Sequence, residues 1–177
     1  MNLVTTAYTA ANGKYTTDRG IPAGQYKLLI LPPLPSPYLL RWYQDKLDFD
    51  SADPVSVTVG VTTGNKNAVL IEGGRITGAV TSASEPGGVE GVLVSAYREH
   101  APDQWAMVKE THTGPGGTYE IQGLEAGNYK VRFYPPAESY YLIEWYNNQA
   151  DLASADLLAV SEGAANGGVD AFLEVGG

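Results

Sequence analysis

Apolar and polar residues alternate along much of this chain, which is the pattern of β-strands whose two faces meet different surroundings. In the clearest stretch, 129–133, three apolar residues alternate with Lys130 and Arg132. No stretch has the apolar stripe of a helix of three turns, and only 149–159 suits one or two helical turns. The pattern predicts strands at 76–80, 92–97, 105–113, 119–121, 129–133, 141–146, 157–161 and 169–175.

Glycine- and proline-rich segments separate these strands, such as GPGG at 114–117 and PP at 135–136. They mark turns and strand ends, because glycine accepts positive φ and proline cannot donate to a β-ladder. About seven or eight short strands with frequent turns predict an all-β fold, an antiparallel β-sandwich. Tyr119 and Tyr129 fall on strands that we expect to be adjacent, so their rings are predicted to form a cross-strand pair.

The chain contains the same sequence pattern twice. AGQYK at 23–27 recurs as AGNYK at 126–130, an offset of 126 − 23 = 103, and SAD at 51–53 recurs at 154–156. A period of this length suits a self-sufficient domain, whereas solenoid units are shorter. We therefore predict two sandwich domains in tandem, 1–74 and 75–177.

The first predicted domain lacks its opening strands. The repeat aligns Leu3 with Met107, so nothing in 1–74 corresponds to the strands at 76–80 and 92–97. Either the chain is a piece of a longer protein, or the missing strands come from elsewhere. A sandwich without them has an open sheet edge, at which we expect strand addition by a partner.

Composition excludes several classes of protein. A formal charge of −9 argues against a nucleic-acid partner. The absence of cysteine removes disulfides, thiolate catalysis and cysteine–zinc sites. No apolar run approaches the roughly 20 residues of a membrane span, and no signal peptide is present in this segment.

Residues 117–131, GTYEIQGLEAGNYKV, resemble the G-x-Y-x-I-x-x-L-x-x-G-x-Y-x-V signature of carboxypeptidase-regulatory-like domains. GRITGAV at 74–80 and GVLV at 91–94 look like the opening of the same family. The resemblance implies a seven-stranded, prealbumin-like sandwich related to collagen-adhesin B-type repeats. It also implies a non-catalytic module of a secreted or cell-surface bacterial protein. Adhesin-type relatives carry a lysine–asparagine crosslink, but 75–80 holds no lysine and Lys130 should face solvent, so we expect none.

Candidate catalytic groups fail an internal test, because chemistry shared by both copies needs the same residue in both. Glu144 corresponds to Arg41, and His100 and His112 have no histidine counterparts. We therefore expect no enzyme, no catalytic residue and no cofactor. Asp48, Asp50 and Asp53, with their counterparts at 151 and 156, lack a calcium-binding spacing, so we expect no metal site either.

Aromatic clusters recur in both copies. The first consists of Tyr38, Trp42 and Tyr43, and the second of Tyr140, Tyr141, Trp145 and Tyr146. These residues either pack into the domains or form a stacking platform for sugar rings. In a regular strand, Tyr141 and Trp145 would share one face and Tyr140 and Tyr146 the other, and either pair could point outward. The prediction is a structural spacer or surface-interaction module that meets a protein or glycan at a cell surface; the alternative is a carbohydrate-binding module of a secreted hydrolase.

Overall fold

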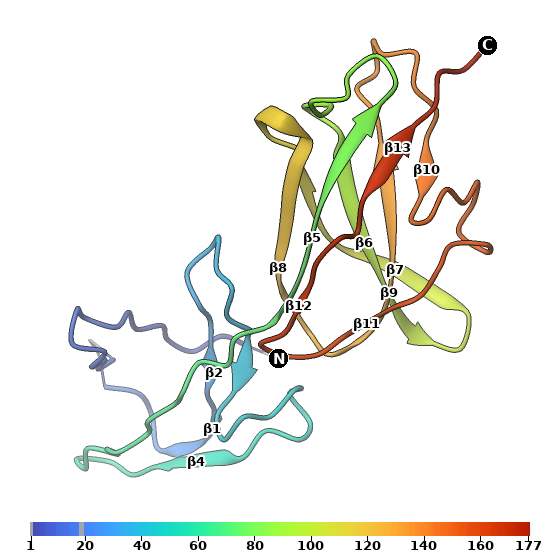
Figure 1. The fold of residues 1–177 in the computed structure, drawn as a ribbon. Helices are drawn as coiled ribbons and strands as arrows, with labels where there is room; N and C mark the ends of the chain where they lie inside the picture. Colours follow the sequence, from blue (N-terminus) through green and yellow to red (C-terminus); the bar gives the residue numbers. More distant parts are fainter. Residues whose placement is uncertain (1, 18–19) are drawn as a thin grey trace. The chain divides into compact units, whose positions relative to one another are not determined.

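The computed structural model describes residues 2–17 and 20–177, and it divides the chain into two compact units. The first unit comprises Met1–Leu31 and Leu40–Val69, and the second comprises Pro32–Leu39 and Leu70–Gly177 (Figure 1). Met1, where the first predicted domain begins, lies outside the described residues. The described residues form strands and turns, and the helical structure among them is a single 3-10 turn, η1 (Pro115–Gly117).

Two sheets build the second unit (Figure 1). In one sheet the strand order is β10-β9-β6-β7, with β11 also pairing with β9. In the other, β5 pairs with β8, β12 and β13. The strands are β5 (Gly74–Ser82), β6 (Leu93–Ala101), β7 (Gln104–His112), β8 (Thr118–Leu124), β9 (Gly127–Tyr134), β10 (Glu144–Trp145), β11 (Leu158–Val160), β12 (Ala165–Asn166) and β13 (Ala171–Leu173).

The core lies between these sheets and follows the predicted alternation. Val131 and Phe133 of β9 are fully buried, as are Ile76 and Val80 of β5. In both strands the residues at every second position point inward, as a strand with one buried face requires. The predicted all-β sandwich is therefore confirmed.

Three local predictions were wrong. Tyr119 and Tyr129 lie in different sheets, and the ring of Tyr119 instead meets Phe133 edge-on at 5.9 Å. The strand expected at 141–146 is reduced to β10 and an isolated bridge at Tyr141, and 149–159 forms turns with no helix.

Both β12 and β13 run parallel to β5, within an otherwise antiparallel structure.

The first unit is smaller and repeats part of the same pairing. Its strands are β1 (Gly24–Lys27), β2 (Leu29–Ile30), β3 (Arg41–Trp42) and β4 (Pro54–Val57). The pairings of β1 with β4 and of β2 with β3 have the registers of β9 with β11 and of β9 with β10, displaced by 103 positions. Among the described residues, β1 pairs with β4 alone, whereas β9 also pairs with β6.

Two residues of the first copy of the repeat, 1–74, are less buried than their counterparts in the second copy. Tyr15 is 38% exposed and Tyr119 6%, and Leu70 is 36% exposed and Leu173 1%. In the second unit the central strands β5 and β6 cover the core, and the described part of the first unit has no counterpart of either strand.

Candidate functional site

The repeated tryptophans are buried. Trp42 is 8% exposed and Trp145 7%, and Tyr43 is buried to a similar degree. The ring of Trp42 meets Phe49 edge-on at 5.3 Å, and Trp145 lies 5.0 Å from Tyr97. Little ring surface remains for stacking on a sugar, so the predicted ligand platform stays a prediction and burial favours the packing role.

Trp145 belongs to a cluster on the outer face of the sheet that the sequence did not reveal. Arg132 of β9 lies over three rings, those of Tyr97 at 5.8 Å, Tyr134 at 5.5 Å and Trp145 at 5.9 Å. The flat guanidinium group is attracted to the faces of these rings, and the rings shield it from water. The sequence signal that could have revealed this cluster is the position of Arg132, between two inward-facing residues of β9.

Tyr141 does not share a face with Trp145, because the chain between them is irregular. Its ring packs against the core, and its hydroxyl group lies 2.8 Å from the Ser82 hydroxyl and 2.7 Å from the Ser84 hydroxyl. The same hydroxyl donates to Glu85 at 2.8 Å. Tyr146 is half-buried and also packs against the core. Tyr141 therefore ties its segment to the end of β5.

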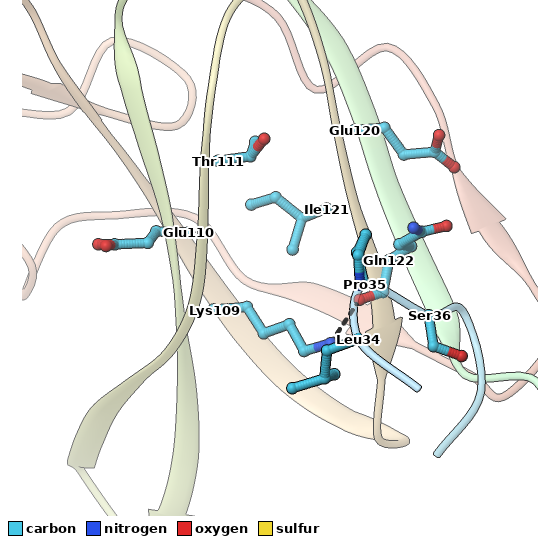
Figure 2. Close-up of a pocket in the computed structure, with 9 residues that line it drawn as sticks. All are labelled: Leu34, Pro35, Ser36, Lys109, Glu110, Thr111, Glu120, Ile121 and Gln122. Carbon is cyan, nitrogen blue, oxygen red and sulfur yellow. Dashed lines mark hydrogen bonds between the residues drawn. The ribbon is translucent and has the colours of Figure 1, made fainter. Parts of the chain in front are cut away.

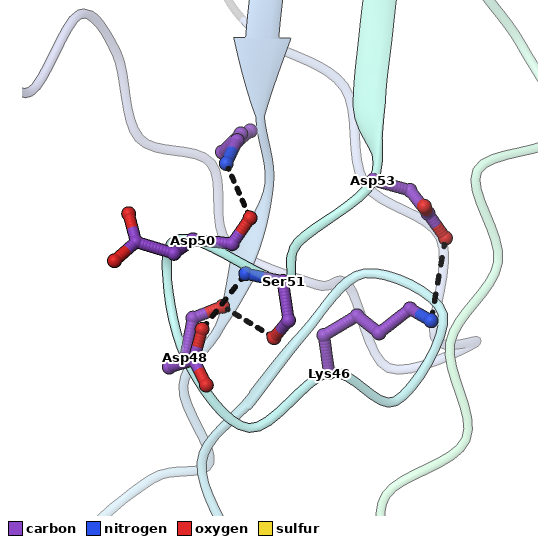
Figure 3. Close-up of polar contacts among 6 residues, drawn as sticks. Lys46, Asp48, Asp50, Ser51 and Asp53 are labelled. Carbon is purple, nitrogen blue, oxygen red and sulfur yellow. Dashed lines mark hydrogen bonds and ion pairs between the residues drawn. The ribbon is translucent and has the colours of Figure 1, made fainter.

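The aspartate-rich loop of the first unit uses its polar groups internally (Figure 3). The Asp48 carboxylate accepts a hydrogen bond from the Ser51 amide at 2.8 Å, and the bonds from Ser51 hold the pKa of Asp48 below its ordinary value. Lys46 forms an ion pair with Asp53 at 4.0 Å. No group of three or more histidine or acidic side chains converges as metal ligands among the residues that the structure describes.

Lys130 was expected to face solvent, and that expectation was wrong. The side chain is only 7% exposed, and its ammonium group donates to the carbonyl oxygens of Leu152 at 2.6 Å and Ala153 at 3.3 Å. It also lies 5.0 Å from the centre of the Trp105 ring. Lys27 makes the corresponding bonds in the first unit, to the carbonyl oxygens of Phe49 and Asp50.

Glu144 is buried on the core side of β10, opposite Phe133. Burial raises the pKa of Glu144 to about 7, although a hydrogen bond from the Phe172 backbone acts in the opposite direction. One carboxylate oxygen has no hydrogen-bond partner. Its counterpart Arg41 is buried too, and donates to Asp45 at 3.1 Å. His100 and His112 are exposed near opposite ends of the β6–β7 hairpin, so they do not join Glu144 in a site.

A pocket of about 470 Å³ opens between the edges of β7 and β8 (Figure 2). Leu34, Pro35 and Ser36 form its third side. Lys109 donates to the Gln122 carbonyl oxygen at 2.9 Å, and burial lowers the pKa of Lys109. This bond joins β7 to β8 on the pocket wall, which Glu110 and Glu120 also line.

Residues 71–144 match a family model described as BOS complex subunit NOMO1-like, second beta sandwich domain. The match covers less than half of the chain and indicates a β-sandwich domain over that range. The matching model is not that of the carboxypeptidase-regulatory-like family, so membership of that family stays a prediction. None of the curated proteins matches the chain.

Two solved structures are similar at 15% identity. The Bacillus anthracis TIE protein has a TM-score of 0.41, with 95% of this chain and 28% of that protein covered. A streptococcal ancillary pilin has a TM-score of 0.37, with 90% of this chain and 45% of that protein covered. The chain thus spans less than half the length of either protein. No helix within the described residues is long and apolar enough to cross a membrane.

Proposed function

We propose that this chain is a non-catalytic structural module, a spacer or surface-interaction segment of a tandem-repeat protein that is secreted or displayed at the cell surface. One observation carries the proposal: the residues that recur at the offset of 103 use their polar groups on the chain's own backbone. Lys27 and Lys130 both donate to loop carbonyl oxygens. Asp48 and Asp151 both accept from a serine amide three positions later, at 2.8 and 2.9 Å.

The residues that differ between the copies are the ones a shared chemistry would have needed. Glu144 has an arginine counterpart, and the two histidines have no histidine counterparts. A repeated module that keeps its structural bonds and varies its reactive groups supports a mechanical role. The resemblance to carboxypeptidase-regulatory-like domains supports the same function and the surface location.

The proposal is tested by presenting the folded 1–177 chain to a glycan array, beside a lectin that reports array quality. A spacer is expected to give background signal on all glycans. Binding to one glycan class, lost on Tyr146→Ala in a variant that remains folded, would replace the spacer by a carbohydrate-binding module. Tyr8→Ala, at an exposed tyrosine outside the aromatic clusters, is the matched control.

A further inference from the structure

Two glycines of the second unit lie where backbones touch. A Cβ atom added to Gly73 would lie 2.7 Å from the Gly123 Cα atom, and one added to Gly123 would lie 2.8 Å from the Ser36 carbonyl oxygen. Any side chain at these positions would force the segments apart, so glycine is required for the close approach. We call this contact of Ser36 and Gly73 with Gly123 the glycine junction.

The two sides of the junction come from different copies of the repeat. Ser36 and Gly73 belong to the first copy, 1–74, and Gly123 lies on β8 of the second. The first side is held together by its own hydrogen bonds, from the Gly73 amide to Pro37 and from the Leu39 amide to Ile71, both at 2.8 Å. We call this side the arm.

The second copy builds the same arm. The Gly176 amide donates to Tyr140 at 2.7 Å and the Leu142 amide donates to Glu174 at 2.8 Å, the same two bonds displaced by 103 positions. A bridge between Tyr141 and Val175 likewise corresponds to one between Tyr38 and Glu72. The second arm therefore has the same two backbone hydrogen bonds and the same bridge as the first arm.

The two arms differ in how far their corresponding residues are buried. Ser36 and Gly73 are buried and Pro37 is half-buried, in a unit where Gly123 covers them. The counterparts Ser139 and Gly176 are half-buried, and Tyr140 is 83% exposed. Leu142 and Val175 add exposed apolar surface beside it. The second arm thus has the backbone hydrogen bonds of the first arm, but no described segment packs on it as Gly123 packs on Ser36 and Gly73.

We propose that Ser139, Tyr140 and Gly176 form a docking surface for a further copy of this repeat, whose equivalent of Gly123 packs on it as Gly123 packs on the first arm. This inference rests on the proposed function, since it needs a tandem array. Charge supports it: Pro35 lines the pocket beside Lys109, and the counterpart of Pro35 is the exposed Glu138. A second arm would thus bring a carboxylate toward the lysine of the added copy.

Matched alanine substitutions test the proposal in the 1–177 chain and in a chain extended by another 75–177 directly after Gly177. Gly73→Ala should lower the melting temperature of both chains by about 2–4 °C or more, because its Cβ meets backbone. Gly176→Ala should be nearly silent in 1–177, where the nearest atom is the movable end of Leu142 at 2.9 Å. In the extended chain Gly176→Ala should become as damaging as Gly73→Ala.

Hydroxyl-radical footprinting gives a second readout that leaves the docking surface unsubstituted. The added segment carries its own Tyr140, which is replaced by phenylalanine so that the two positions are distinguished by peptide mass. Tyr140 of the 1–177 part should then be oxidised severalfold more slowly in the extended chain than in 1–177, with the exposed Tyr8 as internal reference. Unchanged oxidation of Tyr140, or a silent Gly176→Ala in the extended chain, would overturn the docking surface. Either result, with background signal on the glycan array, would leave the spacer function standing, so the two proposals fail separately.

Discussion

Lys130 and Leu152 are joined by a hydrogen bond of 2.6 Å from the side-chain ammonium group to the backbone carbonyl oxygen. Lys27 donates to Phe49 in the same way, 103 positions earlier. Each lysine thus fixes a loop that carries an aspartate–serine turn, at Asp151 and at Asp48. In both copies the carbonyl oxygens of the loop thus accept hydrogen bonds from a charged lysine of the same chain.

Lys130→Met should destabilise the second unit by about 1.5–3 kcal/mol, the usual loss for hydrogen bonds to a charged group. Methionine keeps most of the apolar stem and removes the donor. Denaturant unfolding of 1–177 measures the effect, with Lys14→Met, at an exposed side chain, as control. A Lys130→Met chain as stable as the control would show that the bond to Leu152 is dispensable.

Glu144 makes stability depend on pH. Its pKa rises from 4.5 to about 7 on folding, so the folded chain binds the proton more tightly than the unfolded chain. The contribution of this group is complete below about pH 4.5 and is lost as pH rises to about 7, a change on the order of 3 kcal/mol.

Glu144→Gln should remove that part of the pH dependence and make the chain more stable than the parent at pH 8. Unfolding free energies measured from pH 4.5 to 8 check this, with the exposed Glu138→Gln as control. A parent and a Glu144→Gln chain with parallel pH profiles would contradict the raised pKa.

Tyr141→Phe should cost about 1–2 kcal/mol, because the hydroxyl group contacts Ser82, Ser84 and Glu85 and the Ser82 side chain is buried. Tyr140→Phe, at an exposed ring for which no such bonds are seen, should be neutral. Thermal unfolding of the two variants separates the outcomes. Equal melting temperatures would mean that the hydroxyl cluster does not stabilise the fold.

Residues 1–74 alone should be unfolded, aggregate, or pair with another chain. The described part of this segment has no counterpart of β5 or β6, and Tyr15 and Leu70 are correspondingly exposed. Each uncovered apolar side chain forfeits on the order of 1.5–3 kcal/mol, against a whole-domain margin of about 5–15 kcal/mol. Light scattering and limited proteolysis test this. A monomeric, protease-resistant 1–74 would contradict it.

The strands of the second unit could be predicted from sequence because alternation follows directly from burial of one face, as in β9. The partners of those strands could not. The parallel pairing of β13 with β5 leaves no mark on the alternation of either strand, and Tyr119 and Tyr129 separate into two sheets although they are close in sequence.

The polar contacts were harder to predict than the strands. Lys130 sits at an outward position of β9, and alternation alone places such a residue in solvent. It is buried because the loop at Leu152 folds back over it. The one available signal was the recurrence of lysine at positions 27 and 130. The burial of Glu144 likewise depends on neighbours distant in sequence, such as Phe172.

One copy of the repeat, residues 75–177, should fold by itself as a complete domain. The most direct test is to express this segment alone and follow its unfolding by tryptophan fluorescence and circular dichroism, together with an NMR spectrum of its amides. We expect coincident, cooperative transitions and a dispersed spectrum, because the segment contains the strands of both sheets, apart from Gly74 at the start of β5, around its own core. A collapsed spectrum with no cooperative transition would contradict the account.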